Sequence, residues 1–143
     1  FYGCSSLTSV AIPNSVTSIG ERAFEYCKSL ESIAIGNSVK SIDYHTFFRC
    51  SLLTDVTVGN SVTSIGDCAF EDCTSLKSIT IPDSIESIGK EAFYCCKSLQ
   101  AIRYGGTIAQ WKKINLANDT FKGWNHRSAI NVVHCTDGNM WVH

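Results

Sequence analysis

The sequence lacks an excess of charge of either sign. Only 17% of its residues are charged, and 12 basic against 13 acidic side chains leave a net charge of −1. Nucleic acids and anionic membranes are bound through a basic surface, so the sequence argues against both as partners. No apolar run approaches the roughly 18–20 residues that cross a bilayer, so we expect no membrane insertion.

The sequence also lacks the spacings that are typical of metal and cofactor sites. It has no C-x-x-C pair, no H-x-x-x-H pair and no glycine-rich phosphate loop. Cys95 and Cys96 could be combined with His126, His134 or His143 as zinc ligands, but no zinc-site spacing supports such a set. We therefore expect no metal and no cofactor.

What the sequence does contain is a repeat of 23 residues, of which Leu30–Leu52 is one copy. Three residue types recur in columns at this spacing. The columns are Leu7, Leu30, Leu53, Leu76 and Leu99; Phe1, Phe24, Phe47, Phe70 and Phe93; and Cys4, Cys27, Cys50, Cys73 and Cys96. Self-similarity at such a period predicts a solenoid of about five coils, of the α/β class. Crossovers between parallel strands favour a right-handed winding.

The first part of each repeat predicts a short strand. In Leu30-x-x-Ile33-x-Ile35 the apolar residues alternate and are partly β-branched. A polar residue then follows at a turn, where its side chain can bond the local backbone. The turn residues are Asn14, Asn37, Asn60 and Asp83.

The second and third parts predict a bend and a helical turn. Val16-x-x-Ile19 indicates a short extended piece, and Gly20, Gly66 and Gly89 then supply a permissive backbone. Asp43 takes the place of glycine in the second copy. In the third part, Ala23, Phe24 and Cys27 have the spacing of one face of about one helical turn.

The repeat breaks after Tyr104, so we divide the chain into a solenoid over 1–104 and a modified coil with a C-terminal cap over 105–143. Thr107 is the expected N-cap of a helix over 108–114. Counting by 23 places Gln110 in the outer serine column, Trp111 in the isoleucine column and Lys112 in the glycine column.

The remainder of the cap is expected to cover the last core face. A strand is predicted at Ala129–Cys135, followed by a turn over 136–139 and a short tail from Met140. Phe121 and Trp124, together with Trp111 and this strand, supply the apolar cover.

The five cysteines of the column are expected to be buried free thiols, unreactive until the protein is denatured. Disulfides of a small secreted protein are the alternative. Stacked coils bring the backbones close enough for disulfides, but side chains of one column point the same way. Cys68 shares its column with Arg22, His45 and Glu91 and is expected to be exposed.

Phe1 already lies in the phenylalanine column, so the chain opens within a repeat, and we expect a longer parent protein. The strand at 7–12 would then have an unpaired edge, and Val16, Ile19 and Phe24 would lack a neighbour on one side. An open edge beside an apolar face favours pairing with another chain, so we expect self-association or fraying at the N-terminal end.

The unit at Leu76–Cys96, Leu-x-x-Ile-x-Ile-Pro-x-Ser-Ile-x-x-Ile-Gly-x-x-Ala-Phe-x-x-Cys, resembles the BspA-like (Treponema-type) leucine-rich repeat of bacterial surface proteins. The tail with Gln110-Trp111 and Val133-His-Cys135-Thr-Asp-Gly138 is similar to the closing segment of many such proteins from gut bacteria. The resemblance covers nearly the whole chain. It implies a cell-surface or secreted location and a binding role towards a protein or glycan on a host or neighbouring cell.

The sequence offers one pair with chemical potential. His45 and Cys68 occupy equivalent positions in adjacent repeats, and a cysteine beside a histidine can form a reactive thiolate. No third orienting group is evident, so we interpret the pair as drift on a solvated face and expect no enzyme activity.

Candidate contact residues lie on two surfaces. Outward-facing strand positions are mostly small and uncharged, whereas three aromatic residues are expected on the outside of the third part, where they could be contact anchors or packing residues. The candidates are Ser9, Ser32, Asp55, Ser78, Thr57, Thr80, Arg103, Tyr26, Phe48 and Tyr94. We expect a non-enzymatic protein-binding or adhesion module. The alternative is a structural spacer that presents another domain and has no ligand of its own.

Overall fold

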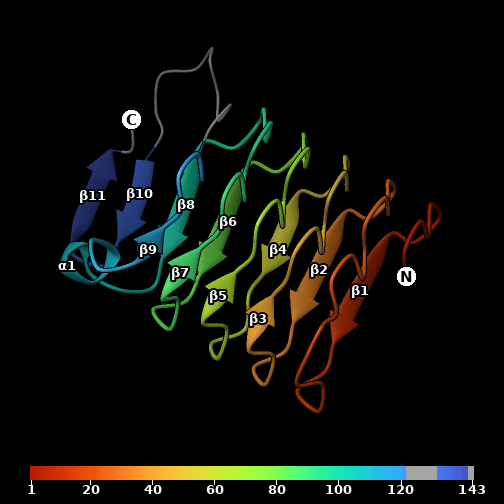
Figure 1. The fold of residues 1–143 in the computed structure, drawn as a ribbon, viewed down its shortest axis with the longest axis horizontal. Coiled ribbons are helices and arrows are strands. Elements are labelled where there is room, and N and C mark those ends of the chain that lie inside the picture. Colours follow the sequence, from red (N-terminus) through yellow and green to blue (C-terminus); the bar gives the residue numbers. More distant parts are fainter. Residues whose placement is uncertain (122–131, 142–143) are drawn as a thin grey trace.

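A computed structural model of the chain describes residues 1–121 and 132–141. The chain winds into a solenoid with two sheets, and Figure 1 shows the coils side by side with the first and last strands at opposite ends. The larger sheet contains β1 (Ser9–Ile12), β2 (Ser32–Ile35), β4 (Asp55–Thr57), β6 (Ser78–Ile81), β8 (Ala101–Tyr104), β10 (Val132–Cys135) and β11 (Gly138–Trp141). The smaller sheet contains β3 (Ser41–Ile42), β5 (Ser64–Ile65), β7 (Ser87–Ile88) and β9 (Asn115–Leu116). The single helix among the described residues is α1 (Ile108–Trp111).

The predicted solenoid and its parallel strands are confirmed. Each strand of the repeat pairs with its equivalent 23 residues on, so that Ser9 lies opposite Ser32 and Ile12 opposite Ile35. The number of turns differs slightly from the expected five. About four turns carry a strand in both sheets, because the first coil forms β1 but no strand in the smaller sheet.

The third side of each coil is not the helical turn that we expected from Ala23, Phe24 and Cys27. It is a run of tight turns in which two residues per coil adopt left-handed backbone angles, for example Arg22 (φ 57°) and Tyr26 (φ 61°). A helix would satisfy its N–H groups within its own coil. Here alternate N–H groups point to the next coil instead, and Phe24 donates to the carbonyl of Thr46 at 2.9 Å. The coils are thus hydrogen-bonded to one another along this side as well.

Two of the three predicted glycines, Gly66 and Gly89, and the turn residues Asn14 and Asn37 act between coils, whereas a side chain at Gly20 would meet nothing within 4 Å. The permissive-backbone interpretation required positive φ at these glycines, but neither Gly66 nor Gly89 has it. A Cβ on Gly66 would instead lie 2.9 Å from the Asp43 carbonyl carbon, so glycine permits close approach of the preceding coil. The side chain of Asn14 likewise accepts from the backbone N–H of Asn37 at 2.8 Å, not from its own turn.

A continuous stack of phenylalanine rings forms the centre of the core. The ring centroids are 5.3 Å apart for Phe1 and Phe24, 5.5 Å for Phe24 and Phe47, and 5.1 Å for Phe47 and Phe70. The expectation that Val16, Ile19 and Phe24 lack a neighbour at the N-terminal end is wrong for Phe24, which the Phe1 ring covers. Ile19 is also buried, whereas Val16 is only half-buried.

The cysteine column runs beside this stack as free thiols. Each buried thiol donates to the carbonyl of a phenylalanine one coil back; Cys50 Sγ lies 3.1 Å from Phe24 O and Cys73 Sγ lies 3.2 Å from Phe47 O. Burial raises the pKa of Cys50 to about 12. The prediction of buried thiols holds for four of the five residues, namely Cys27, Cys50, Cys73 and Cys96, whereas Cys4 is half-buried because it lies in the first coil.

The last repeat is longer than counting by 23 assumes. Thr107 caps α1 in a reciprocal capping box with Gln110, as expected at this end, but the helix ends at Trp111 instead of at residue 114. The helix adds five residues to the coil. As a result Leu116 rather than Trp111 pairs with Ile88, and Asn115 rather than Gln110 pairs with Ser87.

The C-terminal end is closed by an additional hairpin. β10 continues the larger sheet parallel to β8, and β11 pairs with β10 in the antiparallel direction. Phe121 extends the phenylalanine stack, with its ring 6.2 Å from that of Phe93. The predicted contribution of Trp124 and the start of the Ala129–Cys135 strand lie outside the described residues.

Candidate functional site

The outer face of the larger sheet brings the strand candidates together in two rows that run across the strands. Parallel register places Ser32 beside Ser9 and Asp55, and places Thr57 beside Ala34 and Thr80. The row that contains Thr80 continues through Arg103 to His134, a half-buried residue that the sequence analysis did not select. A shallow depression of about 330 Å³ lies over β1, β2 and β4 of the larger sheet. Its outer lining is Ser9, Ala11, Ser32, Ala34, Asp55 and Thr57, which are small and mostly uncharged side chains.

The aromatic candidates lie on a different surface, along the tight turns of the third side. Tyr26 meets Phe48 edge-on, with ring centroids 5.6 Å apart. Tyr2 meets Tyr26 in the same way at 6.0 Å. Tyr26 and Phe48 are half-buried, while Tyr2 and Tyr44 are exposed at 63% and 37%. These contacts join successive coils into one aromatic surface.

Two arginines complete this surface. The Arg49 guanidinium lies 5.1 Å from the centroid of the Phe48 ring and 5.7 Å from that of Tyr26. Its Nε lies 3.2 Å from Asp72 Oδ2, an ion pair that fixes the direction of the side chain. The Arg22 guanidinium lies 5.4 Å from the centroid of the Tyr44 ring. We call Tyr2, Arg22, Tyr26, Tyr44, Phe48 and Arg49 the aromatic patch.

Tyr94 does not belong to the aromatic patch. It occupies the same column as Phe48 but two coils further on, with Glu71 in the coil between them. Tyr94 is half-buried. A hydrogen bond between its phenol and the neighbouring Cys95 thiol raises the pKa of Tyr94. The three aromatic candidates are therefore one contacting pair and one separate residue.

The structure places His45 and Cys68 next to each other, as expected from their columns, and adds a third group. A ring nitrogen of His45, the Sγ of Cys68 and a carboxylate oxygen of Glu71 lie within 4.8 Å of one another. Cys68 is half-buried rather than exposed. Burial, followed by a hydrogen bond to Glu71 and the charges of nearby carboxylates, raises the pKa of Cys68 to about 12. A catalytic cysteine shows the opposite shift, because its thiolate is the nucleophile.

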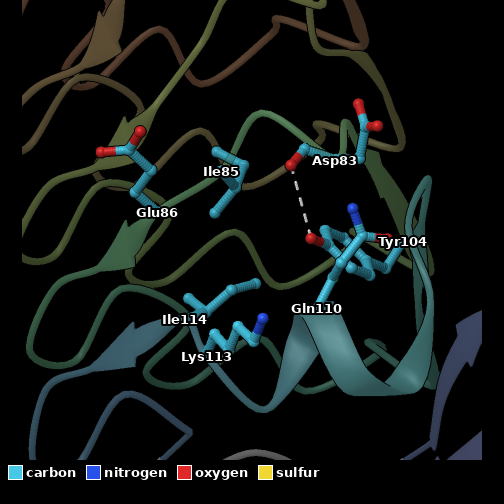
Figure 2. A pocket seen from close by; sticks show the side chains of 7 residues that line it. All are labelled: Asp83, Ile85, Glu86, Tyr104, Gln110, Lys113 and Ile114. Carbon is cyan, nitrogen blue, oxygen red and sulfur yellow. Dashed lines mark hydrogen bonds between the residues drawn. The ribbon is translucent and has the colours of Figure 1, made fainter.

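A second depression, of about 210 Å³, lies where α1 meets the fourth coil (Figure 2). Figure 2 shows its walls, formed by Asp83, Ile85 and Glu86 on one side and Tyr104, Gln110, Lys113 and Ile114 on the other. The Tyr104 hydroxyl donates to the backbone carbonyl of Asp83 at 3.4 Å. None of these seven residues is a cysteine, serine or histidine, so the depression offers no nucleophile of those types.

The sequence analysis missed four members of the aromatic patch and the acidic partners of His45. A signal for Arg49 was present, since it shares a column with Tyr26 and Asp72, its two contacts in the adjacent coils. Glu71 and Glu25 could not be found by column alone. They belong to the column of Phe48, and they reach His45 and Cys68 diagonally across the left-handed turns.

These features define a leucine-rich repeat solenoid with an exposed aromatic surface. The BspA type leucine rich repeat region matches residues 1–123 in six copies, and the chain belongs to this family.

Solved structures support the same fold. The leucine-rich repeat protein of T. pallidum is 30% identical with a TM-score of 0.70, and the match covers 83% of this chain and 59% of that protein. A leucine-rich repeat protein of Bacteroides ovatus is 36% identical with a TM-score of 0.64, over 72% of this chain and 33% of that one. A leucine rich cell surface protein of Faecalibacterium prausnitzii is 32% identical with a TM-score of 0.52, over 75% and 34%.

This chain therefore spans about three fifths of the first of these proteins and one third of the other two. No curated protein sequence matches it significantly. Within the described residues, there is no helix with the length and apolar character needed to cross a membrane.

Proposed function

We propose that the chain is a non-enzymatic protein-binding module of a bacterial cell-surface or secreted protein, and that the aromatic patch is its contact surface. The observation that carries the proposal is the contact of aromatic and arginine side chains from successive coils in one exposed surface. Tyrosine and arginine are enriched among residues that dominate binding energy, whereas serine and threonine are under-represented there.

The aromatic patch is also held in place before any partner arrives. Arg49 is fixed between two aromatic rings and Asp72, and Tyr26 is fixed between Tyr2 and Phe48. A surface whose side chains are already ordered loses less conformational entropy on association. Repeat scaffolds serve many binding roles, so the partner is defined by the patch rather than by the fold.

The other candidate residues have a smaller role in this proposal. Asp55, Arg103 and the small polar residues of the sheet face form a flat surface that offers few anchors, and Tyr94 stands apart. The F. prausnitzii relative is described as a cell surface protein, which supports the proposed location. We retain the proposed division into a solenoid over 1–104 and a cap over 105–143. The proposed partner class is a protein or glycan on a host or neighbouring cell. We also retain self-association at the N-terminal end as a proposal.

A structural spacer is the second candidate function. The observation that favours it is the sheet face itself, where Ser9, Ser32, Thr57 and Thr80 provide no concentration of charge or aromatic surface. Such a chain would hold a neighbouring domain at a distance and bind nothing.

Binding of fluorescently labelled protein to cultured epithelial cells and to a panel of immobilised extracellular matrix proteins separates the two candidates. The patch variant is Tyr2→Ser/Tyr44→Ser, which removes two exposed rings. The matched control is Trp141→Ser, which removes an exposed ring (55%) at the opposite end. A single residue that dominates binding contributes about 2 kcal/mol or more, so we expect the patch variant to bind at least roughly 30-fold more weakly and the control to bind normally.

Two outcomes contradict the proposal. Equal loss in both variants would place the contact elsewhere. Absence of saturable binding by the unmodified chain to every probe would favour the spacer.

A further inference from the structure

His45, Cys68 and Glu71 form a cluster next to the aromatic patch, which His45 contacts through the rings of Tyr44 and Phe48. The three side chains come from two adjacent coils, and His45 and Cys68 both adopt left-handed backbone angles (φ 54°). The turn geometry points their side chains to one place, where a ring nitrogen, a thiol sulfur and a carboxylate oxygen lie within 4.8 Å of one another. All three residues are half-buried.

The chemistry of this set fits a divalent transition metal. Imidazole, thiolate and carboxylate are the three protein ligand types of Zn²⁺, at about 2.0–2.3 Å from the ion. Tetrahedral geometry at those bond lengths separates the ligand atoms by about 3.3–3.8 Å. The separations in the metal-free structure are at most 4.8 Å, so binding requires them to shorten by no more than about 1.5 Å. Hard cations such as Ca²⁺ and Mg²⁺ prefer all-oxygen sites, so the thiol selects against them.

A second and independent observation concerns His45. Its ring is stacked between Tyr44, with centroids 3.9 Å apart, and Phe48, at 4.3 Å. The two rings fix the plane of the imidazole, so that only its edge is free to make polar contacts. Its Nδ1 is buried and has no hydrogen-bond partner in the described structure.

Glu25 approaches the same edge of His45 from the preceding coil. It is 5% exposed, its Oε1 lies 3.8 Å from His45 Nδ1, and its Oε2 lies 3.4 Å from Arg22 Nε without a hydrogen bond. Histidines that bind metals usually donate their second ring N–H to a carboxylate, which fixes the tautomer. Glu25 is placed for this role if Nδ1 carries the proton and Nε2 faces the metal.

We propose that His45, Cys68 and Glu71 bind one Zn²⁺ ion or a similar transition-metal ion, with Glu25 as a positioning residue for His45 and water in the fourth position. On binding, the Cys68 sulfur forms a bond to the metal and its proton leaves to solvent. In the metal-free protein a Glu71 carboxylate oxygen accepts a hydrogen bond from the Cys68 thiol. Once that proton has left, Glu71 coordinates the metal through a carboxylate oxygen. We predicted no metal site because the sequence has no metal-binding motif with close ligand spacing. This ligand set does not form such a motif, because 22 residues separate His45 from Cys68.

Titration of the untagged, reduced protein with Co²⁺ tests the proposal, because a cobalt–thiolate bond gives a charge-transfer absorption band in the near-ultraviolet. We expect one equivalent of Co²⁺ to produce this band and Zn²⁺ to displace it, because Zn²⁺ favours tetrahedral sites built from thiolate, imidazole and carboxylate ligands. Cys68→Ser should abolish the band. The matched control is Cys95→Ser, a half-buried cysteine in the next coil, which should retain it.

Further variants keep the test decisive if Cys68→Ser folds poorly. Glu71→Gln should weaken metal binding without removing the thiol. Glu25→Gln should keep one equivalent of metal and its thiolate band but lower the affinity roughly 10–100-fold, with the melting temperature of the metal-free protein unchanged. Absence of the band in the unmodified protein, the same band in Cys68→Ser, or its loss in Cys95→Ser would each overturn the assignment.

Discussion

The first and the fourth coils carry nearly the same sequence pattern but differ in how well they are buried. Leu76, Ile79 and Ile81 of the fourth coil are at most 1% exposed. Their counterparts Leu7, Val10 and Ile12 are only half-buried. The fourth coil has a neighbour on each side, since β6 pairs with both β4 and β8, whereas β1 pairs only with β2. Burial in this protein is therefore supplied by adjacent coils and not by a coil's own residues.

The phenylalanine stack shows the same difference and gives the largest expected effect. Phe70 is fully buried between Phe47 and Phe93, whereas Phe1 is 68% exposed and has one ring neighbour. We expect Phe70→Ala to lower the free energy of unfolding by roughly 3–5 kcal/mol. Phe1→Ala should lower it by about 1 kcal/mol, the value of one ring contact. Chemical denaturation measures both, and equal effects would refute the dependence on neighbours.

The cysteine column predicts a loss of stability in alkaline solution. The folded protein holds the pKa of Cys50 at about 12, mainly through burial, while an unfolded thiol ionises near pH 9. Below that pH both states are protonated and stability does not depend on this group. Between about pH 9 and 12 the unfolded state loses the proton first, so stability falls with rising pH, by at most about 1.4 kcal/mol per pH unit for this thiol.

Cys50→Ala should flatten this slope, as measured by denaturation at a series of pH values. Leu53→Ala is the matched control, because it also empties a buried site but removes no ionisable group. An unchanged slope in Cys50→Ala would show that the thiol does not contribute to the alkaline loss.

The periodic columns were sufficient to predict the solenoid, the strand positions and the phenylalanine core. They could not predict the tight turns, because Ala23, Phe24 and Cys27 have helical spacing, and hydrogen bonds to the next coil decide the outcome. Counting by 23 also failed after Tyr104, where the capped helix adds residues and shifts Leu116 into the isoleucine column.

The candidate sites were predicted less completely than the fold. The columns predicted that His45 and Cys68 are adjacent, but Glu71 and Glu25 reach them diagonally between columns. The pairing of Tyr26 with Phe48 has the same origin, since the two residues occupy neighbouring columns in successive coils. Contacts across columns depend on the left-handed angles at Tyr26, His45 and Cys68, which the repeat pattern does not indicate.

Amide hydrogen exchange tests the dependence of each coil on its neighbours most directly. Residues 7–20 and residues 76–89 are equivalent segments three coils apart, and the first includes the edge strand β1. For the monomeric chain we predict faster exchange in residues 7–20, with the difference decreasing at higher protein concentration if the edge pairs with another copy. Equally slow exchange of both segments in a chain shown to be monomeric by light scattering would contradict the account.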